Sequence, residues 1–167
     1  MKYVMIRTDD MLNGSGLRVV LFVSKCSHHC RGCHNPESWD DSCAKLFDDE
    51  AKENIFSELK KDYISGLTLS GGDPLHKENI KDVLSLVKEI KETFPDKQTW
   101  LYTGYTYSDI LNNPGMLEII KYCDVLVDGK FEIDNADVKY RWAGSVNQRV
   151  INVRESLKQN KVVLYED

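Results

Sequence analysis

The sequence has 167 residues, enough for one domain with a substantial core but too few for two of ordinary size. Hydrophobic residues make up 41% and charged residues 29%, which is typical of a soluble globular protein. The formal net charge of -5 argues against nucleic-acid binding through overall positive charge, although a local basic patch would still allow it. No apolar run approaches the roughly 20 residues that cross a bilayer. We expect one domain over residues 1–167, with neither nucleic acid nor membrane as a direct partner.

The predicted strands are short, nearly continuous apolar runs, as expected of strands buried on both faces. The predicted helices show apolar residues at helical spacing. Acidic residues favour the start of the first helix, and Pro95 stops the second. In chain order the predicted elements are strand 19–23, helix 51–59, strand 66–69, helix 80–90, strand 99–102, helix 107–111, helix 116–122 and strand 124–127.

Strands that alternate with helices predict βα units, right-handed crossovers and a mostly parallel sheet. A closed eight-fold barrel needs about 250 residues. The expected fold is therefore α/β: a partial (open) βα barrel with mostly parallel strands. In such sheets ligands bind at the C-terminal ends of the strands, and every polar motif considered below directly follows a predicted strand.

The five cysteines are odd in number, and three of them fall within eight residues. The first ten residues are broken by charges and lack the apolar core and cleavage site of a signal peptide, so we expect a cytoplasmic protein. Disulfides are rare in that reducing compartment. The cysteines therefore favour a metal or redox site over a disulfide framework.

Cys26, Cys30 and Cys33 follow the first predicted strand with the spacing C-x3-C-x2-C. A structural zinc site has four ligands, commonly as two C-x2-C knuckles, and no second knuckle exists here. Three thiolates suit a [4Fe–4S] cluster whose fourth iron is open to an external ligand. The alternative is zinc bound by these cysteines and a fourth ligand from His28, His29, His34 or Cys43.

The cysteine spacing on a loop after the first strand resembles the radical S-adenosylmethionine superfamily. Further segments are similar to its subgroup of activating proteins for anaerobic ribonucleotide reductase, and this combination is highly specific. Gly32 agrees with that subgroup, although many superfamily members have an aromatic residue there, and Ser15 stands where the family usually has proline. The segments that carry the resemblance are 13–18, the cysteine loop through Asn35 and Trp39, 66–75, 100–105, 124–131 and 141–149.

The resemblance implies an oxidoreductase that consists of a single radical S-adenosylmethionine domain. Cys26, Cys30 and Cys33 would bind one [4Fe–4S] cluster, and S-adenosyl-L-methionine would bind its fourth iron. Reductive cleavage of S-adenosylmethionine would give a 5′-deoxyadenosyl radical. That radical would take a hydrogen atom from a glycine of anaerobic ribonucleoside-triphosphate reductase and leave a glycyl radical. Because cofactors carry this chemistry, no side chain is expected to be catalytic.

The implied partners are the glycine loop of the reductase's large subunit and an electron donor such as flavodoxin or ferredoxin. The nearest alternative is an activase for another glycyl-radical enzyme. An alternative of a different class is a non-catalytic zinc-binding interaction module, which would need a fourth protein ligand at knuckle spacing.

Further cofactor-binding residues are expected at three places. Gly71, Gly72 and Asp73 would meet the methionine amino group, with the glycines allowing close backbone approach; the alternative is a turn in which Asp73 caps a helix near residue 76. Gly32, Cys33 and His34 would lie beside the adenine. Asp128 and Lys130 would contact the cofactor's carboxylate or ribose, and the alternative there is a charged surface turn.

The remaining motifs have less specific interpretations. We expect Trp39 to pack over the cysteine loop, and His28 and His29 to be solvated loop residues. Residues 102–105 either shape the site or pack in the core. We hypothesise that segment 141–149 shapes the opening through which the partner's glycine loop enters. Cys43 and Cys123 are expected to be bystanders, the latter as a small buried hydrophobe.

Overall fold

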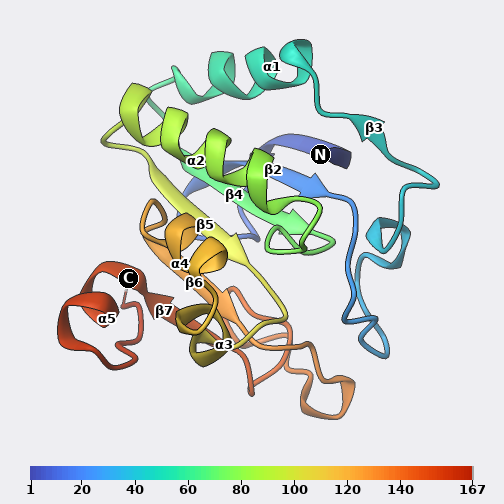
Figure 1. The fold of residues 1–167 in the computed structure, drawn as a ribbon, viewed down its shortest axis with the longest axis vertical. Helices are drawn as coiled ribbons and strands as arrows, with labels where there is room; N and C mark the ends of the chain where they lie inside the picture. The colour runs from blue at the N-terminus through green and yellow to red at the C-terminus, as the bar shows by residue number, and fades with distance from the viewer. Residues whose placement is uncertain (167) are drawn as a thin grey trace.

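The computed structural model describes residues 1–166 and contains one seven-stranded sheet with helices on one face (Figure 1). The sheet order is β3-β1-β2-β4-β5-β6-β7. The strands are β1 (Lys2–Asp10), β2 (Leu17–Val23), β3 (Lys45–Leu46), β4 (Ile64–Gly71), β5 (Gln98–Tyr102), β6 (Val125–Asp128) and β7 (Arg149–Asn152). The helices are α1 (Asp49–Leu59), α2 (Ile80–Thr93), α3 (Tyr107–Leu111), α4 (Pro114–Ile120) and α5 (Val153–Gln159), with short 3-10 turns η1 (Pro36–Ser38) and η2 (Ile133–Asn135).

The centre of the sheet confirms the expected open βα architecture. Strands β2, β4, β5 and β6 run parallel to one another. The edges differ, because β1 is antiparallel to both β2 and β3, and β7 is antiparallel to β6. The sequence analysis did not predict β1, β3, β7 or α5. Strand β1 is only half-buried along most of its length and ends in polar and charged residues, and β7 has only two apolar residues, Val150 and Ile151, so neither shows the buried apolar run of a central strand.

The helix-covered face of the sheet carries the main core. Alternate residues of the central strands point there, including Leu21, Leu69, Leu101 and Leu126, all fully buried. Acidic residues stand at the start of α1 as expected, and the Asp48 side chain also accepts a hydrogen bond from Ala51 N there.

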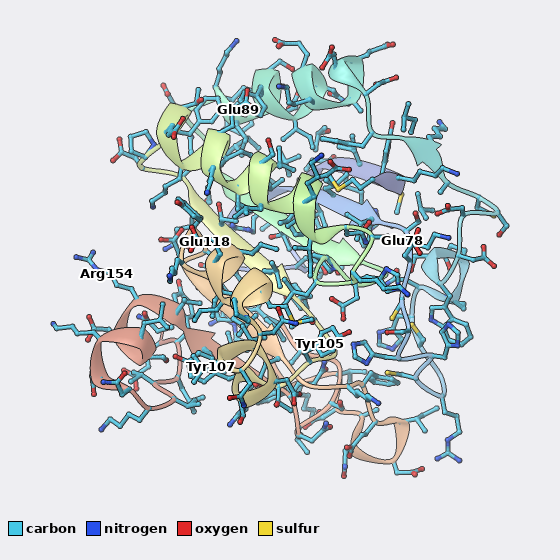
Figure 2. All side chains as sticks on the ribbon, in the orientation of Figure 1. Glu78, Glu89, Tyr105, Tyr107, Glu118 and Arg154 are labelled. Atoms are coloured by element: carbon cyan, nitrogen blue, oxygen red, sulfur yellow. The ribbon has the colours of Figure 1, made fainter. Side chains whose placement is uncertain are left out.

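Ion pairs connect neighbouring helices on the outer side of this layer. Lys52 of α1 lies 3.1 Å from Glu89 of α2, and Lys88 of α2 lies 3.6 Å from Glu118 of α4. Figure 2 shows Glu89 between α1 and α2, and Glu118 on α4. These half-exposed pairs contribute little to stability, so the apolar layer beneath them carries most of the packing energy.

The opposite face of the sheet is more polar. Arg18 of β2 is completely buried there, and its guanidinium donates to Thr68 Oγ1 at 2.8 Å and to the Leu67 and Gln98 carbonyls at 2.9 and 2.7 Å. The guanidinium also lies 5.3 Å from the Trp100 ring centroid. Burial lowers the pKa of Arg18 to about 10. The carbonyl oxygens and the aromatic ring stabilise the buried cation.

The register of β2 and β4 brings two chemically important loops together. Val23, the last residue of β2, pairs with Gly71, the last residue of β4. The cysteine loop and the Gly71–Asp73 segment therefore leave the sheet side by side.

Among residues 1–166, no helix is long and apolar enough to cross a membrane.

Candidate functional site

A cleft of about 840 Å³ lies at the C-terminal ends of the parallel strands. Its lining joins the cysteine loop, the ends of β4 and β5, and the segment between β6 and β7. This is where ligands bind in open parallel sheets. The residues that line this cleft include Cys26, Cys30, Cys33, His34, Trp39, Gly71, Gly72, Tyr102 and Trp142.

Cys26, Cys30 and Cys33 all line this cleft, and each of them is half-buried. Backbone hydrogen bonds hold the loop that carries them, from Cys26 N to Trp39 O and from Cys33 N to Cys30 O, both at 3.1 Å. The loop turns sharply because His29 adopts a left-handed conformation with φ of 46°. The backbone N–H of Asn35 also donates to Cys33 Sγ at 3.4 Å.

Opposing influences act on the charge of the thiols. Burial raises the pKa of both Cys26 and Cys30. The backbone N–H of His28 acts in the other direction at Cys26, and the backbone N–H of Phe131 does so at Cys30, together with the charge of Lys130. Hydrogen bonds to sulfur favour the thiolate, which is the form that binds metal.

The candidates for a fourth zinc ligand make other contacts. His28 Nε2 lies 2.8 Å from Asp73 Oδ2, and the His29 ring stacks on Trp39 with centroids 4.7 Å apart. His34 packs against Phe131, and Cys43 is exposed and does not line the cleft. Within residues 1–166, no three or more His, Cys, Asp or Glu side chains converge on one metal position, and this applies to the three cysteines as well as to these candidates.

Asp73 is buried, with 1% of its surface exposed, and its carboxylate is directed at protein groups. It accepts hydrogen bonds from Leu75 N, Thr103 Oγ1 and Gly104 N, besides contacting His28. The alternative prediction that Asp73 caps a helix near residue 76 is wrong, because α2 begins at Ile80 with Asn79 as its N-cap. The sequence analysis missed His28 and Thr103 as partners of Asp73, since these contacts join segments far apart in the chain.

Positions 71 and 72 need glycine because neighbouring backbone atoms lie too close to leave room for a side chain. A Cβ on Gly71, whose φ is +98°, would lie 2.7 Å from the Val23 carbonyl oxygen. A Cβ on Gly72 would lie 2.6 Å from the Lys25 oxygen and 2.8 Å from the Ser38 oxygen. The two glycines therefore allow the β4 end to pack directly against the cysteine loop while still lining the cleft.

Gly32 and His34 differ in placement although they flank the same cysteine. His34 lines the cleft. Gly32 is exposed, with φ of +73°, and its position faces Ile133 of η2 rather than the cleft; a Cβ there would lie 2.5 Å from Ile133 Cδ1.

Asp128 and Lys130 are not among the residues that line the cleft. Side chains alternate along β6, so Val125 and Val127 face the cleft side while Asp128 faces the helices. The buried Asp128 carboxylate accepts hydrogen bonds from Tyr107 N at 2.7 Å and from the Arg149 guanidinium. Asp128 thus forms an ion pair with Arg149 of β7, a strand that the sequence analysis did not identify. Lys130 is exposed, and only its charge reaches the site, at Cys30.

Two residues that line the cleft have buried polar atoms without a hydrogen-bond partner in the described chain. They are Tyr102, through its hydroxyl, and Trp39, through Nε1. Burial raises the pKa of Tyr102, so its hydroxyl stays protonated and can donate. Unsatisfied buried donors are rare in folded proteins, and here they fit a ligand rich in hydrogen-bond acceptors.

The segment between β6 and β7 forms the remaining wall. Gln148 organises it: its Oε1 accepts from Gly144 N at 2.9 Å, and its Nε2 donates to the Gly129 carbonyl at 2.9 Å. Trp142, in a left-handed conformation with φ of 61°, packs against Trp100 and Tyr165. The loop is thereby anchored to the sheet and held over the cleft.

Comparison with known proteins agrees with these observations. A family described as "4Fe-4S single cluster domain" matches residues 12–151. The chain is 45% identical over 150 residues to an anaerobic ribonucleoside-triphosphate reductase-activating protein of Pasteurella multocida, covering 89% of this chain and 95% of that protein. The identity is 45% to the protein of the same name from Enterobacteria phage T4 (90% and 93% covered) and 40% to that of Escherichia coli K12 (87% and 94%).

These relatives span nearly the whole chain, and the matched family segment includes all three cysteines of the cleft. The chain therefore belongs to the family of anaerobic ribonucleoside-triphosphate reductase-activating proteins, with a 4Fe-4S single cluster domain.

Proposed function

We propose that this chain activates an anaerobic ribonucleoside-triphosphate reductase by generating a glycyl radical on it. The observation that carries the proposal is that Cys26, Cys30 and Cys33 line one cleft together with the ends of β4 and β5. Family membership supports the same activity, because the relatives are named for it. The protein acts here as a scaffold that binds and orients cofactors.

The residues of the cleft fit a [4Fe–4S] cluster and S-adenosylmethionine. The three cysteines would bind the cluster as thiolates, each supported by nearby N–H groups. Tyr102 and Trp39 have buried donors without a partner in the described chain, as is common next to a ligand site. When bound, the reduced cluster and S-adenosylmethionine supply a one-electron cleavage whose organic radical abstracts a hydrogen atom from glycine.

The chain's own residues orient the ligands and exclude water. Gly71 and Gly72 let the β4 end lie directly against the cysteine loop, so the cofactor-binding walls form a single surface. Apolar side chains of the lining, among them Phe22, Trp39 and Phe131, limit the access of water to the site. Shielding from water by these side chains and by the bound ligands would suit a radical that otherwise reacts with solvent or buffer.

The glycine-bearing loop of the reductase's large subunit is the proposed macromolecular substrate. Segment 141–149 is proposed to shape its entry, since Trp142 lines the cleft and is anchored against Trp100. Replacement of Trp142 by Ala should then reduce reductase activation more than cofactor cleavage. An equal loss of both would assign the segment to structure or cofactor binding. A small redox protein such as flavodoxin or ferredoxin is the proposed electron donor.

The proposal is tested by anaerobic reconstitution of the protein with iron and sulfide, followed by reduction and mixing with S-adenosylmethionine and the reductase. Electron paramagnetic resonance should show a glycyl radical on the reductase. Normal cleavage of S-adenosylmethionine without that signal would point to a different glycyl-radical enzyme as the substrate.

A further inference from the structure

We propose that His28 and Asp73 are a positioning pair for this reaction. Their contact ties the cysteine loop to the ends of β4 and β5 and so sets the place of the cluster relative to the rest of the cleft. The inference rests on the proposed function and concerns the geometry of the same site. It also changes the expected roles of both residues, which were a solvated loop histidine and a cofactor-binding acid.

The contact is short and well protected from water. His28 Nε2 lies 2.8 Å from Asp73 Oδ2, with side-chain exposures of 9% for His28 and 1% for Asp73. The ionised carboxylate can only accept, so the proton of the imidazole lies on Nε2 in this pairing. Hydrogen bonds to a charged group in a buried setting are stronger than those between neutral groups.

Besides His28, other protein groups donate hydrogen bonds to both oxygens of the Asp73 carboxylate. Leu75 N donates to Oδ1 at 2.8 Å, Thr103 Oγ1 donates at 2.9 Å, and Gly104 N donates to Oδ2 at 3.1 Å. A carboxylate has about four acceptor positions. With His28 these positions are occupied, so Asp73 serves the protein's own loops and has no acceptor left for a ligand.

The imidazole ring has a defined seat on the β5 loop. A Cβ on Gly104 would lie 2.4 Å from the His28 ring, so only glycine leaves room for it there. The Tyr105 ring contacts His28 edge-on, with centroids 4.6 Å apart. Tyr105 lies just beyond the end of β5 (Figure 2). The seat therefore fixes the ring in position as well as in hydrogen bonding.

The place of His28 in the sequence connects this seat to the site. It lies between Cys26 and Cys30, two residues from each, so the backbone that the ring anchors also carries both thiols. Errors of about 1 Å in the placement of reacting groups reduce rates by as much as about 100-fold. The contact of His28 with the ends of β4 and β5 therefore keeps the cysteine loop at a fixed position relative to the opposite wall of the cleft.

The experiment compares His28→Phe with His28→Gln in the reconstituted full chain. Phenylalanine keeps an aromatic ring for the Gly104 and Tyr105 contacts but cannot donate, whereas the glutamine amide can still donate to Asp73. The matched control is His76→Phe, because His76 does not line the cleft and its ring accepts a long hydrogen bond of 3.3 Å from Glu78 N in an exposed turn. Iron content, affinity for S-adenosylmethionine and the electron paramagnetic resonance spectrum of the reduced cluster are measured for each.

In His28→Phe we expect iron content close to wild type, an affinity for S-adenosylmethionine about tenfold weaker, and a smaller spectral change on its addition. His28→Gln should restore affinity to within about threefold of wild type, and His76→Phe should match wild type. Loss of iron in His28→Phe with full iron in His28→Gln would also support the anchor.

Equal behaviour of His28→Phe, His28→Gln and wild type would overturn the inference, as would equal loss of iron in both variants. In the double variant with Asp73→Asn, His28→Phe should cause little additional loss, since the shared contact is already weakened. Additive losses would contradict a pair that acts together. Failure of the proposed function is distinguishable, because the wild-type protein itself would then give no glycyl radical.

Discussion

The two faces of the sheet use alternate residues of the same strands for different tasks. On β5, Leu101 points into the helix-covered core, while Trp100 and Tyr102 belong to the face that carries the cleft. The first face buries mostly apolar side chains, besides Thr99 and Asp128, whereas the second buries Arg18, Thr68 and the Tyr102 hydroxyl. Neighbouring residues of one strand therefore serve different purposes: one packs in the core and stabilises the fold, and the next faces the cofactor cleft. Variants on the two faces should separate fold stability from cofactor binding.

The largest separation is expected at the cysteines. Cys33→Ser should abolish cluster binding while the fold persists, because Cys33 is half-buried on the cleft wall and outside the main core. Iron and sulfide analysis together with far-ultraviolet circular dichroism measures this. Cys43→Ser is the control and should keep full iron content; if it loses iron as well, Cys43 is a ligand and the three-cysteine assignment fails.

On the helix side, Leu101→Ala should lower the free energy of unfolding by about 2–5 kcal/mol, since it leaves a cavity in a fully buried layer. Folded molecules of this variant should still bind a full cluster and S-adenosylmethionine with wild-type affinity. Urea denaturation and iron content per folded protein test both statements. A parallel fall in cofactor affinity would show that the two faces are coupled.

Asp128 offers a sharper test, because it was expected in the cleft and lies on the helix side. Asp128→Asn should destabilise the fold by about 2 kcal/mol by weakening the half-exposed pair with Arg149. The cost should be nearly constant from about pH 6 to about pH 9: Asp128 raises the pKa of Arg149, so its charge is lost only at far higher pH. Denaturation at several pH values measures this, and weaker binding of S-adenosylmethionine at unchanged stability would restore Asp128 as a cofactor ligand.

The smallest effect is expected at Tyr102, and it has the opposite sign. Tyr102→Phe removes a buried hydroxyl that has no partner in the described chain, so the protein without cofactors should gain about 1 kcal/mol of stability. Thermal unfolding before reconstitution measures the gain. Destabilisation would mean that the hydroxyl has a partner within the folded chain.

The central fold and the cysteine site could be predicted from the sequence, and the reasons are local. Buried parallel strands read as apolar runs, and the spacing of Cys26, Cys30 and Cys33 is a property of one loop. The contact between His28 and Asp73 joins positions 45 residues apart, so it could not be predicted from local pattern. The orientation of Asp128 could have been predicted, because period-two alternation places it on the same side as Leu126.

Strand β7 has a consequence for how this molecule meets other proteins. Its outer edge is already paired with the returning C-terminal segment, through Asn152 N to Val163 O at 2.9 Å and Tyr165 N to Val150 O at 2.8 Å. An unpaired edge would invite an extended peptide to add as a further strand, and would risk aggregation. At this end of the sheet that mode of association is blocked. A protein partner that approaches from the β7 side must recognise side chains and loops rather than the backbone of a strand.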